Sequence, residues 1–163
     1  MAIYEKLEGP AMQAYREMYS NLKSRAVSQL KLPEEEVIMR ALRPEDVGLS
    51  DPVFTFSVSS GWNTIIDTDI ADSRFVGIHG ILIGESGTSV VTQIKVTRMG
   101  QTKRYWHVQD VNFLESPVIY FDDPIIVDQN TKLTIEAYAT GSDTDLRLTF
   151  LGAVAEKKGL LVQ

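Results

Sequence analysis

Residues 132–150 read KLTIEAYATGSDTDLRLTF, and apolar and polar side chains alternate along two parts of this stretch. The alternating apolar residues are Leu133, Ile135, Ala137, Ala139, Leu146, Leu148 and Phe150. Successive side chains of a β-strand point to opposite faces of its sheet, so the pattern predicts two strands with one buried face each. Gly, Ser and Asp at 141–143 are typical of the turn between them. The stretch therefore predicts an antiparallel β-sheet.

The same two-residue period extends over most of residues 51–163. Strand candidates follow one another at the spacing of about 8 to 12 residues that is typical of a β-sandwich or barrel. The candidates are residues 53–59, 63–67, 75–83, 89–98, 103–108, 117–121, 125–127, 132–140 and 146–154. We predict an all-β fold, an antiparallel jelly-roll-like sandwich of eight to nine strands. An immunoglobulin-like sandwich is the alternative, and the missing cysteine pair disfavours it.

The N-terminal part of the chain has a different period. Between Pro10 and Lys31 the apolar residues recur at steps of three and four, which predicts an amphipathic helix of about 20 residues. Pro33 is a helix stop, because its ring disfavours helical geometry in the residue before it. Residues 33–42 are compatible with either a short second helix or an extended segment. The stripe residues are Met12, Tyr15, Met18, Tyr19, Leu22, Ala26, Val27 and Leu30.

These two periods predict an N-terminal helical arm over residues 1–50 and a β-sandwich body over residues 51–163. An amphipathic helix usually covers its own core, so the arm packs either on its own body or on a neighbouring subunit. Tyrosine and methionine on the stripe favour the neighbouring subunit, because interfaces are enriched in both. The candidate partner-binding residues of the arm are Met12, Tyr15, Met18, Tyr19 and Leu22.

The composition excludes several classes of function. The chain has a net charge of −6, and residues 51–163 carry nine Lys and Arg against fourteen Asp and Glu. Such a surface repels a phosphate backbone, so nucleic-acid binding is not expected. The chain has no cysteine, which excludes disulfides, thiolate metal sites and thiol nucleophiles. No apolar run approaches the roughly 18 residues that span a bilayer, and no signal peptide is visible, so we expect a soluble chain without membrane contact.

Patterns that carry catalysis or metal binding are weak. His79 and His107 lie in separate strand candidates, without the close His-x-His spacing of a cupin site. Asp67, Asp69 and Asp72 lack the glycine and glutamate of an EF-hand loop, so a solvated loop is the favoured interpretation and a structural cation at a subunit contact is the alternative. Nucleophile-elbow and phosphate-loop motifs are absent. We predict no enzyme activity, no metal and no cofactor.

Residues 98–106, RMGQTKRYW, form the basic and aromatic segment of the acidic body. Cationic side chains at a hairpin edge that block aggregation are one interpretation. Arginine and aromatic residues are also typical of protein-binding hot spots, which makes Arg104, Tyr105 and Trp106 candidate partner-binding residues. Aromatic stacking on a sugar is the third interpretation, and a carbohydrate- or receptor-binding module is therefore the alternative function. Its candidate residues are Trp62, Tyr105, Trp106 and Tyr138.

The run DPIIVDQNTKLTIEAY at 123–138, followed by LTFLGAVA at 148–155, resembles the last strands of β-sandwich proteins from tailed-phage virions. The resemblance extends in pattern over residues 53–155. Among such proteins, capsid decoration proteins sit on the outer shell as trimers. The resemblance therefore implies a structural virion protein that forms a homotrimer, binds the major capsid protein or another shell protein, and is made in the host cytoplasm.

Overall fold

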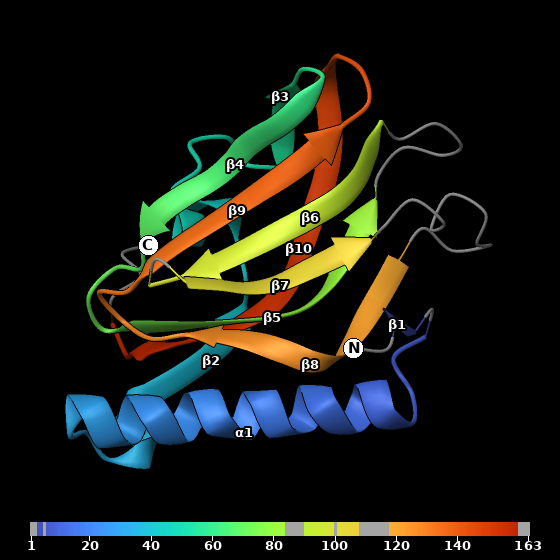
Figure 1. Cartoon of the computed structure of the whole chain (residues 1–163). Coiled ribbons are helices and arrows are strands. Elements are labelled where there is room, and N and C mark those ends of the chain that lie inside the picture. Colours follow the sequence, from blue (N-terminus) through green and yellow to red (C-terminus); the bar gives the residue numbers. More distant parts are fainter. Residues whose placement is uncertain (1–2, 5, 84–89, 100, 108–117, 160–163) are drawn as a thin grey trace.

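The computed structural model of the chain describes residues 3–4, 6–83, 90–99, 101–107 and 118–159 (Figure 1). These residues form two antiparallel sheets and an N-terminal helix, which confirms the predicted all-β sandwich with its helix. The elements are β1 (Ile3–Tyr4), α1 (Pro10–Leu30), the 3-10 helix η1 (Glu34–Glu36), β2 (Val37–Ala41), the 3-10 helix η2 (Pro44–Val47), β3 (Thr55–Val58), β4 (Gly61–Asp69), β5 (Arg74–Ile83), β6 (Val91–Arg98), β7 (Gln101–His107), β8 (Val118–Val127), β9 (Lys132–Ala139) and β10 (Asp143–Lys157).

Strands β3 to β10 pair in a nested antiparallel order, in which the first strand pairs with the last, the second with the next to last, and so on inward. β3 pairs with β10, β4 with β9, β5 with β8 and β6 with β7. Further pairing of β10 with β5 and of β9 with β6 joins them into two sheets. One sheet has six strands in the order β1-β8-β5-β10-β2, with β3 also on β10, and the other has four in the order β4-β9-β6-β7. This nested order is that of a jelly roll and differs from the immunoglobulin alternative.

The structure corrects the sequence prediction in one segment and decides between two alternatives in another. The predicted strands 117–121 and 125–127 are a single strand, β8, because residues 121–124 stay extended opposite one residue of β5, His79. Pro124 lies in this irregular part, where its missing N–H breaks no ladder. Residues 33–42 take the extended alternative: after η1 they form β2, which pairs with β10 at the edge of the six-stranded sheet.

Helix α1 covers the outer face of the six-stranded sheet, where it packs on β8, β5 and β10 (Figure 1). It begins at Pro10, which suits the first helical position, and ends at Leu30. The next residue, Lys31, takes the left-handed conformation (φ 54°). Its buried residues are Ala11, Ala14, Met18, Leu22 and Ala26. Met18, Leu22 and Ala26 of the predicted stripe thus face the chain's own body, whereas Tyr19 of the same stripe is exposed.

The apolar side chains form two clusters, one on each side of the six-stranded sheet. The main core lies between the two sheets and contains fully buried residues of both, among them Trp106, Phe121, Phe150, Ile94 and Ile135. The second lies under α1 and consists of Met18, Leu22, Ala26, Val37, Phe75, Ala153 and Ala155. Both faces of β5 are therefore buried, which accounts for its nearly continuous apolar sequence.

Two glycines let β5, β10 and α1 approach closely. A Cβ atom on Gly77 would lie 2.7 Å from Met18 Sδ and 2.9 Å from Leu22 Cδ1, so α1 rests on this position. A Cβ atom on Gly152 would lie 1.9 Å from the carbonyl oxygen of Gly77, at a shift in the β10–β5 register. Only glycine fits at Gly152, because the obstructing atom belongs to the backbone.

We expect Gly152→Ala to lower the free energy of unfolding by about 3 kcal/mol, because the added methyl group displaces the backbone of β5. Urea unfolding measures the change. Gly141→Ala is the matched control, since its Cβ would lie 3.8 Å from Val90 Cγ1, an ordinary contact. Equal unfolding midpoints for the two variants would contradict the close approach.

A buried cluster of ions joins β2 to the end of β10. Arg40 on β2 donates to both carboxylate oxygens of Asp46, at 2.7 and 2.6 Å, and to those of Glu156 at 2.9 and 3.2 Å. Arg74 Nε donates to Glu156 Oε2 at 3.1 Å. The side chains of Asp46 and Glu156 have no exposed area. The hydrogen bond to Asp46, and next that to Glu156, raise the pKa of Arg40 above its ordinary value against the effect of burial.

Glu156→Gln should lower the free energy of unfolding by about 3 kcal/mol, because it leaves two partly buried guanidinium groups with one carboxylate. Thermal or urea unfolding measures the loss. Glu45→Gln is the control: Glu45 pairs with Arg43 at 3.5 Å on the surface, where a pair contributes less than about 1 kcal/mol. A loss for Glu156→Gln no larger than that of the control would show that the cluster adds nothing to stability.

Candidate functional site

The outer face of the four-stranded sheet carries a group of aromatic and charged side chains. Each of the strands β4, β9, β6 and β7 contributes to it. The register places Trp62 opposite Tyr138, and Lys95 between Glu136 and Tyr105. Alternation sends their neighbours Ile94, Val96 and Ala137 into the core, where they are fully buried. We call this group the sheet-face patch: Trp62, Lys95, Tyr105, Glu136 and Tyr138.

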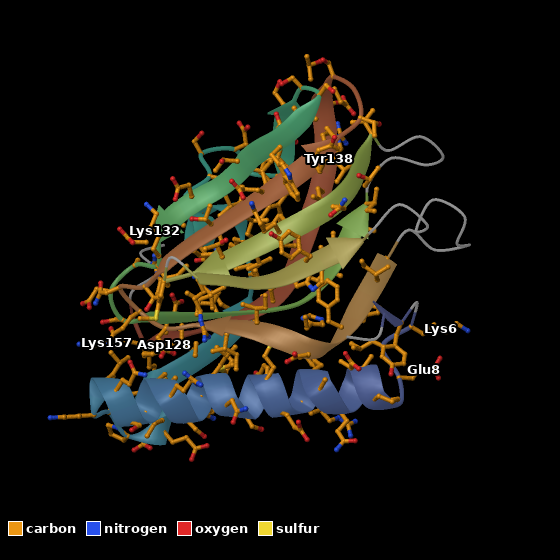
Figure 2. The ribbon with its side chains drawn as sticks, in the orientation of Figure 1. Lys6, Glu8, Asp128, Lys132, Tyr138 and Lys157 are labelled. Carbon is orange, nitrogen blue, oxygen red and sulfur yellow. The ribbon has the colours of Figure 1, made fainter. Side chains whose placement is uncertain are left out.

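The rings of the patch meet at steep angles. The centroids of Trp62 and Tyr138 are 5.3 Å apart with planes at 74°, and those of Trp62 and Tyr105 are 6.3 Å apart at 68°. Figure 2 shows Tyr138 on this face, at the opposite end of β9 from Lys132. Trp62 is 42% exposed and Tyr105 is 53% exposed. The patch is thus an open corner of rings that solvent reaches.

Lys95 links the rings to a carboxylate. Its Nζ lies 4.7 Å from the centre of the Trp62 ring, within the range of a cation–π contact. The same atom lies 2.7 Å from Glu136 Oε2. The hydrogen bond to Glu136 raises the pKa of Lys95 above its ordinary value. The amine therefore stays charged, and the carboxylate beside it balances that charge.

Three of the four residues predicted for sugar stacking come together in the patch, and Trp106 does not. Trp106 is fully buried and stacks on Phe121, with centroids 4.0 Å apart and planes at 18°. Partner binding and sugar stacking both need an exposed ring, so both interpretations of Trp106 are wrong for the folded chain. Adjacent residues of a strand face opposite ways, and here Tyr105 is the one that faces solvent. Arg104 lies on β7, where its backbone pairs with Val96 of β6, but its side chain lies outside the described residues. Lys95 and Glu136 carry no signal in the sequence, because only the strand register brings them together.

The predicted contact residues of the arm are divided between the core and the surface. Met18 and Leu22 are buried against the body, so the expectation that they contact a neighbouring subunit does not hold while α1 is docked. Met12 and Tyr15 are half-buried. Tyr19 is 38% exposed and lies on the outer side of the helix.

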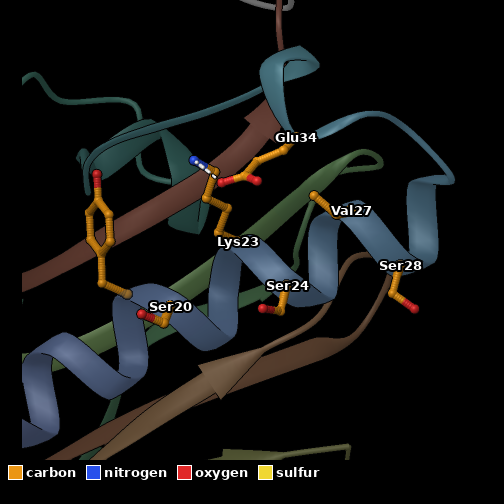
Figure 3. Close-up of a pocket in the computed structure, with 7 residues that line it drawn as sticks. Ser20, Lys23, Ser24, Val27, Ser28 and Glu34 are labelled. Atoms are coloured by element: carbon orange, nitrogen blue, oxygen red, sulfur yellow. Dashed lines mark ion pairs between the residues drawn. The ribbon is translucent and has the colours of Figure 1, made fainter.

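A shallow groove of about 520 Å³ runs along the outer side of α1 (Figure 3). Three serines follow one another at four-residue spacing along it, which places them on one helix face. Lys23 Nζ contacts Glu34 Oε1 at 3.1 Å, and this pair joins α1 to η1 across the groove. The lining residues are Tyr19, Ser20, Lys23, Ser24, Val27, Ser28 and Glu34.

His79 is buried under α1 between two tyrosines. The ring centroids lie 4.5 Å from Tyr15 and 5.8 Å from Tyr120, and the His79 and Tyr120 planes are 16° apart. The side chain is 8% exposed, and its Nδ1 has no hydrogen-bond partner among the described residues. Burial lowers the pKa of His79 from 6.5 to about 4. The structure thus holds a neutral imidazole against the helix.

The remaining candidate chemistry is dispersed. The described residues contain no group of three or more side chains placed to hold a metal ion. The side chain of His107 lies outside the described residues. Asp67 lies on β4 and contacts Lys132 at 3.3 Å, whereas Asp72 accepts a hydrogen bond from Asn130 at 3.1 Å. Asp69, at the end of β4, is exposed and has Lys132 as its strand partner on β9, so Asp67 and Asp69 share one lysine neighbour while Asp72 lies apart from them beside Asn130.

The chain was compared with protein families, with curated proteins and with solved structures. No family model matches the sequence, and no curated protein matches it. The crystal structure of the infectious bursal disease virus VP2 subviral particle is similar over 74% of this chain, with 14% sequence identity and a TM-score of 0.35. The chain spans about a third of that protein, 32% of its length. In the part of the chain that the structure describes, no helix is long and apolar enough to cross a bilayer.

The position of His79 predicts a loss of stability in acid. Because the folded state lowers the pKa of His79, its contribution is fully present above pH 6.5 and is lost as the pH falls toward 4. We expect the free energy of unfolding to fall by about 2 to 3 kcal/mol between about pH 7.5 and 4.5 on account of this residue.

Urea unfolding of the wild type and of His79→Phe at both pH values isolates the effect, since phenylalanine keeps a ring between Tyr15 and Tyr120 without titrating. Carboxylates titrate equally in both proteins and cancel in the difference. The same pH dependence in both would show that His79 is charged without cost in the folded state.

Proposed function

We propose that the chain is a non-enzymatic structural subunit of a virion. More narrowly, it is a decoration protein that forms a homotrimer and binds the outer shell of a tailed-phage capsid, with the major capsid protein or another shell protein as partner. Its place is then the virion, after synthesis in the host cytoplasm. The resemblance of residues 123–138 and 148–155 to phage β-sandwich proteins motivates this assignment.

The outer face of α1 is the observation that carries the proposal. The helix uses Met18 and Leu22 to dock on its own body, and the opposite face has no cover from the described residues. Ser20, Ser24 and Ser28 are small, and small side chains let a second backbone approach closely. Tyr19 and Val27 border them and supply contact area. This face suits a neighbouring subunit.

The charges along this face suit a copy of the same chain. Arg16 and Glu17 are exposed on α1, and Lys23 is already paired with Glu34. Both signs are therefore present side by side, so a symmetric arrangement of copies can bring opposite charges together. Closed symmetric oligomers depend on such complementary patches.

A single substitution tests this better than removal of the arm. Deleting residues 1–32 would expose Phe75 and Ala155, which α1 covers. Ser24→Arg, in contrast, places a long charged side chain in the groove without touching the core. We expect light scattering to give the mass of three chains for the wild type and of one chain for Ser24→Arg.

Ser142→Arg is the matched control, because Ser142 is an exposed serine between β9 and β10. It should keep the wild-type mass, and circular dichroism should be unchanged in both variants. A wild-type chain that stays monomeric at high concentration would overturn the oligomeric assignment. A trimer that Ser24→Arg leaves intact would move the subunit contact to another face.

A further inference from the structure

We propose that the sheet-face patch is a binding site for a neutral saccharide, and that it accepts a single sugar unit or the end of a short chain. The patch lies on the four-stranded sheet, whereas the face proposed for assembly lies on α1, which covers the other sheet. The proposal therefore goes beyond the structural role and does not depend on it.

The patch combines rings with polar groups in the way that a sugar requires. Trp62 and Tyr105 are among the most exposed large apolar side chains of the described residues. Polar residues lie beside the patch on the neighbouring strands: Thr64 of β4 is opposite Glu136, and Gln93 of β6 is opposite Tyr138. Aromatic faces contact the C–H faces of a sugar, and amide, hydroxyl and carboxylate groups bind its hydroxyls. The centre of a stable protein interface is more apolar than this.

The charge of the patch favours a neutral ligand. Lys95 and Glu136 are the charged members, and they contact each other at 2.7 Å. Their charges balance, so the centre of the patch attracts neither anions nor cations strongly. The chain as a whole carries −6, which disfavours acidic polymers further. Both groups still have free hydrogen-bonding capacity, because an ammonium has three donors and a carboxylate has several acceptor positions.

The angles between the rings limit the size of the ligand. A long polysaccharide lies flat across rings that share a plane, and Trp62 stands at 74° to Tyr138 and at 68° to Tyr105. Rings at such angles form a corner. One sugar unit fits a corner by placing one face on a ring and its edge hydroxyls toward Lys95 and Glu136. The geometry thus selects a terminal or single unit.

The test begins with the labelled full-length chain on an array of neutral, sialylated and sulfated glycans. We expect binding to neutral glycans only. Tyr105→Ala and Trp62→Ala should each weaken binding by about tenfold or more, because each removes one ring of the corner. Val53→Ala is the control: Val53 is 57% exposed, lies just before β3, and belongs to neither the patch nor the proposed assembly face, so this variant should bind as the wild type does.

Tryptophan fluorescence gives a second readout. Trp106 is fully buried, so acrylamide quenches Trp62, which is 42% exposed. The glycan that binds most strongly on the array should protect Trp62 from acrylamide in the wild type and in Val53→Ala. Tyr105→Ala should need about tenfold more of this glycan for the same protection. Circular dichroism shows that each variant is folded.

Three results would overturn the proposal. The first is a wild-type chain that binds no neutral glycan on the array or binds only charged ones. The second is a Tyr105→Ala variant that binds its glycan as tightly as the wild type. The third is a drop in the mass of the oligomer on Tyr105→Ala, which would assign the patch to a contact between protein subunits.

Discussion

The buried carboxylate of Glu156 is the constraint on which the N-terminal third of the fold depends. A carboxylate without exposed area is costly unless it is paired, and its partners come from two other strands, Arg40 from β2 and Arg74 from β5. Asp46 shares Arg40 with it. The cluster is complete only when β2, β5 and β10 are all in place, so residues 37–47 are held firmly to the sheet.

This anchoring changes what the helix can do. α1 is followed by β2, which the ion cluster holds, and preceded by β1, which pairs with β8. Gly77 lets its buried face come close to β5. A helix fixed at both ends and along its length acts as a cover for the six-stranded sheet. Its outer face, and not its buried residues Met18 and Leu22, is then the part that a neighbour can contact.

The jelly-roll pairing divides the molecule into two unlike surfaces. The six-stranded sheet is covered by α1, whereas the four-stranded sheet presents its outer face to solvent (Figure 1). Nested hairpins bring β4, β9, β6 and β7 side by side although they span residues 61–139. Trp62, Lys95, Glu136 and Tyr138 meet there for that reason alone. The two proposed contacts lie on opposite sides of one core, so a subunit held by α1 leaves the patch accessible.

The sequence by itself determined the type of each main element. Alternating apolar residues predict the strands, and apolar residues at steps of three and four predict a helix from Pro10. The reason is local: the backbone geometry of a strand or a helix fixes which residues share a face. It also determined that Tyr105 and Trp106 face opposite ways, because they are adjacent in one strand. Only the tertiary structure decided that residues 37–41 join the sheet, that Met18 and Leu22 face inward, and that Lys95 meets Glu136 beside Trp62. These outcomes depend on strand register and long-range pairing, which are set by contacts between residues far apart in the chain.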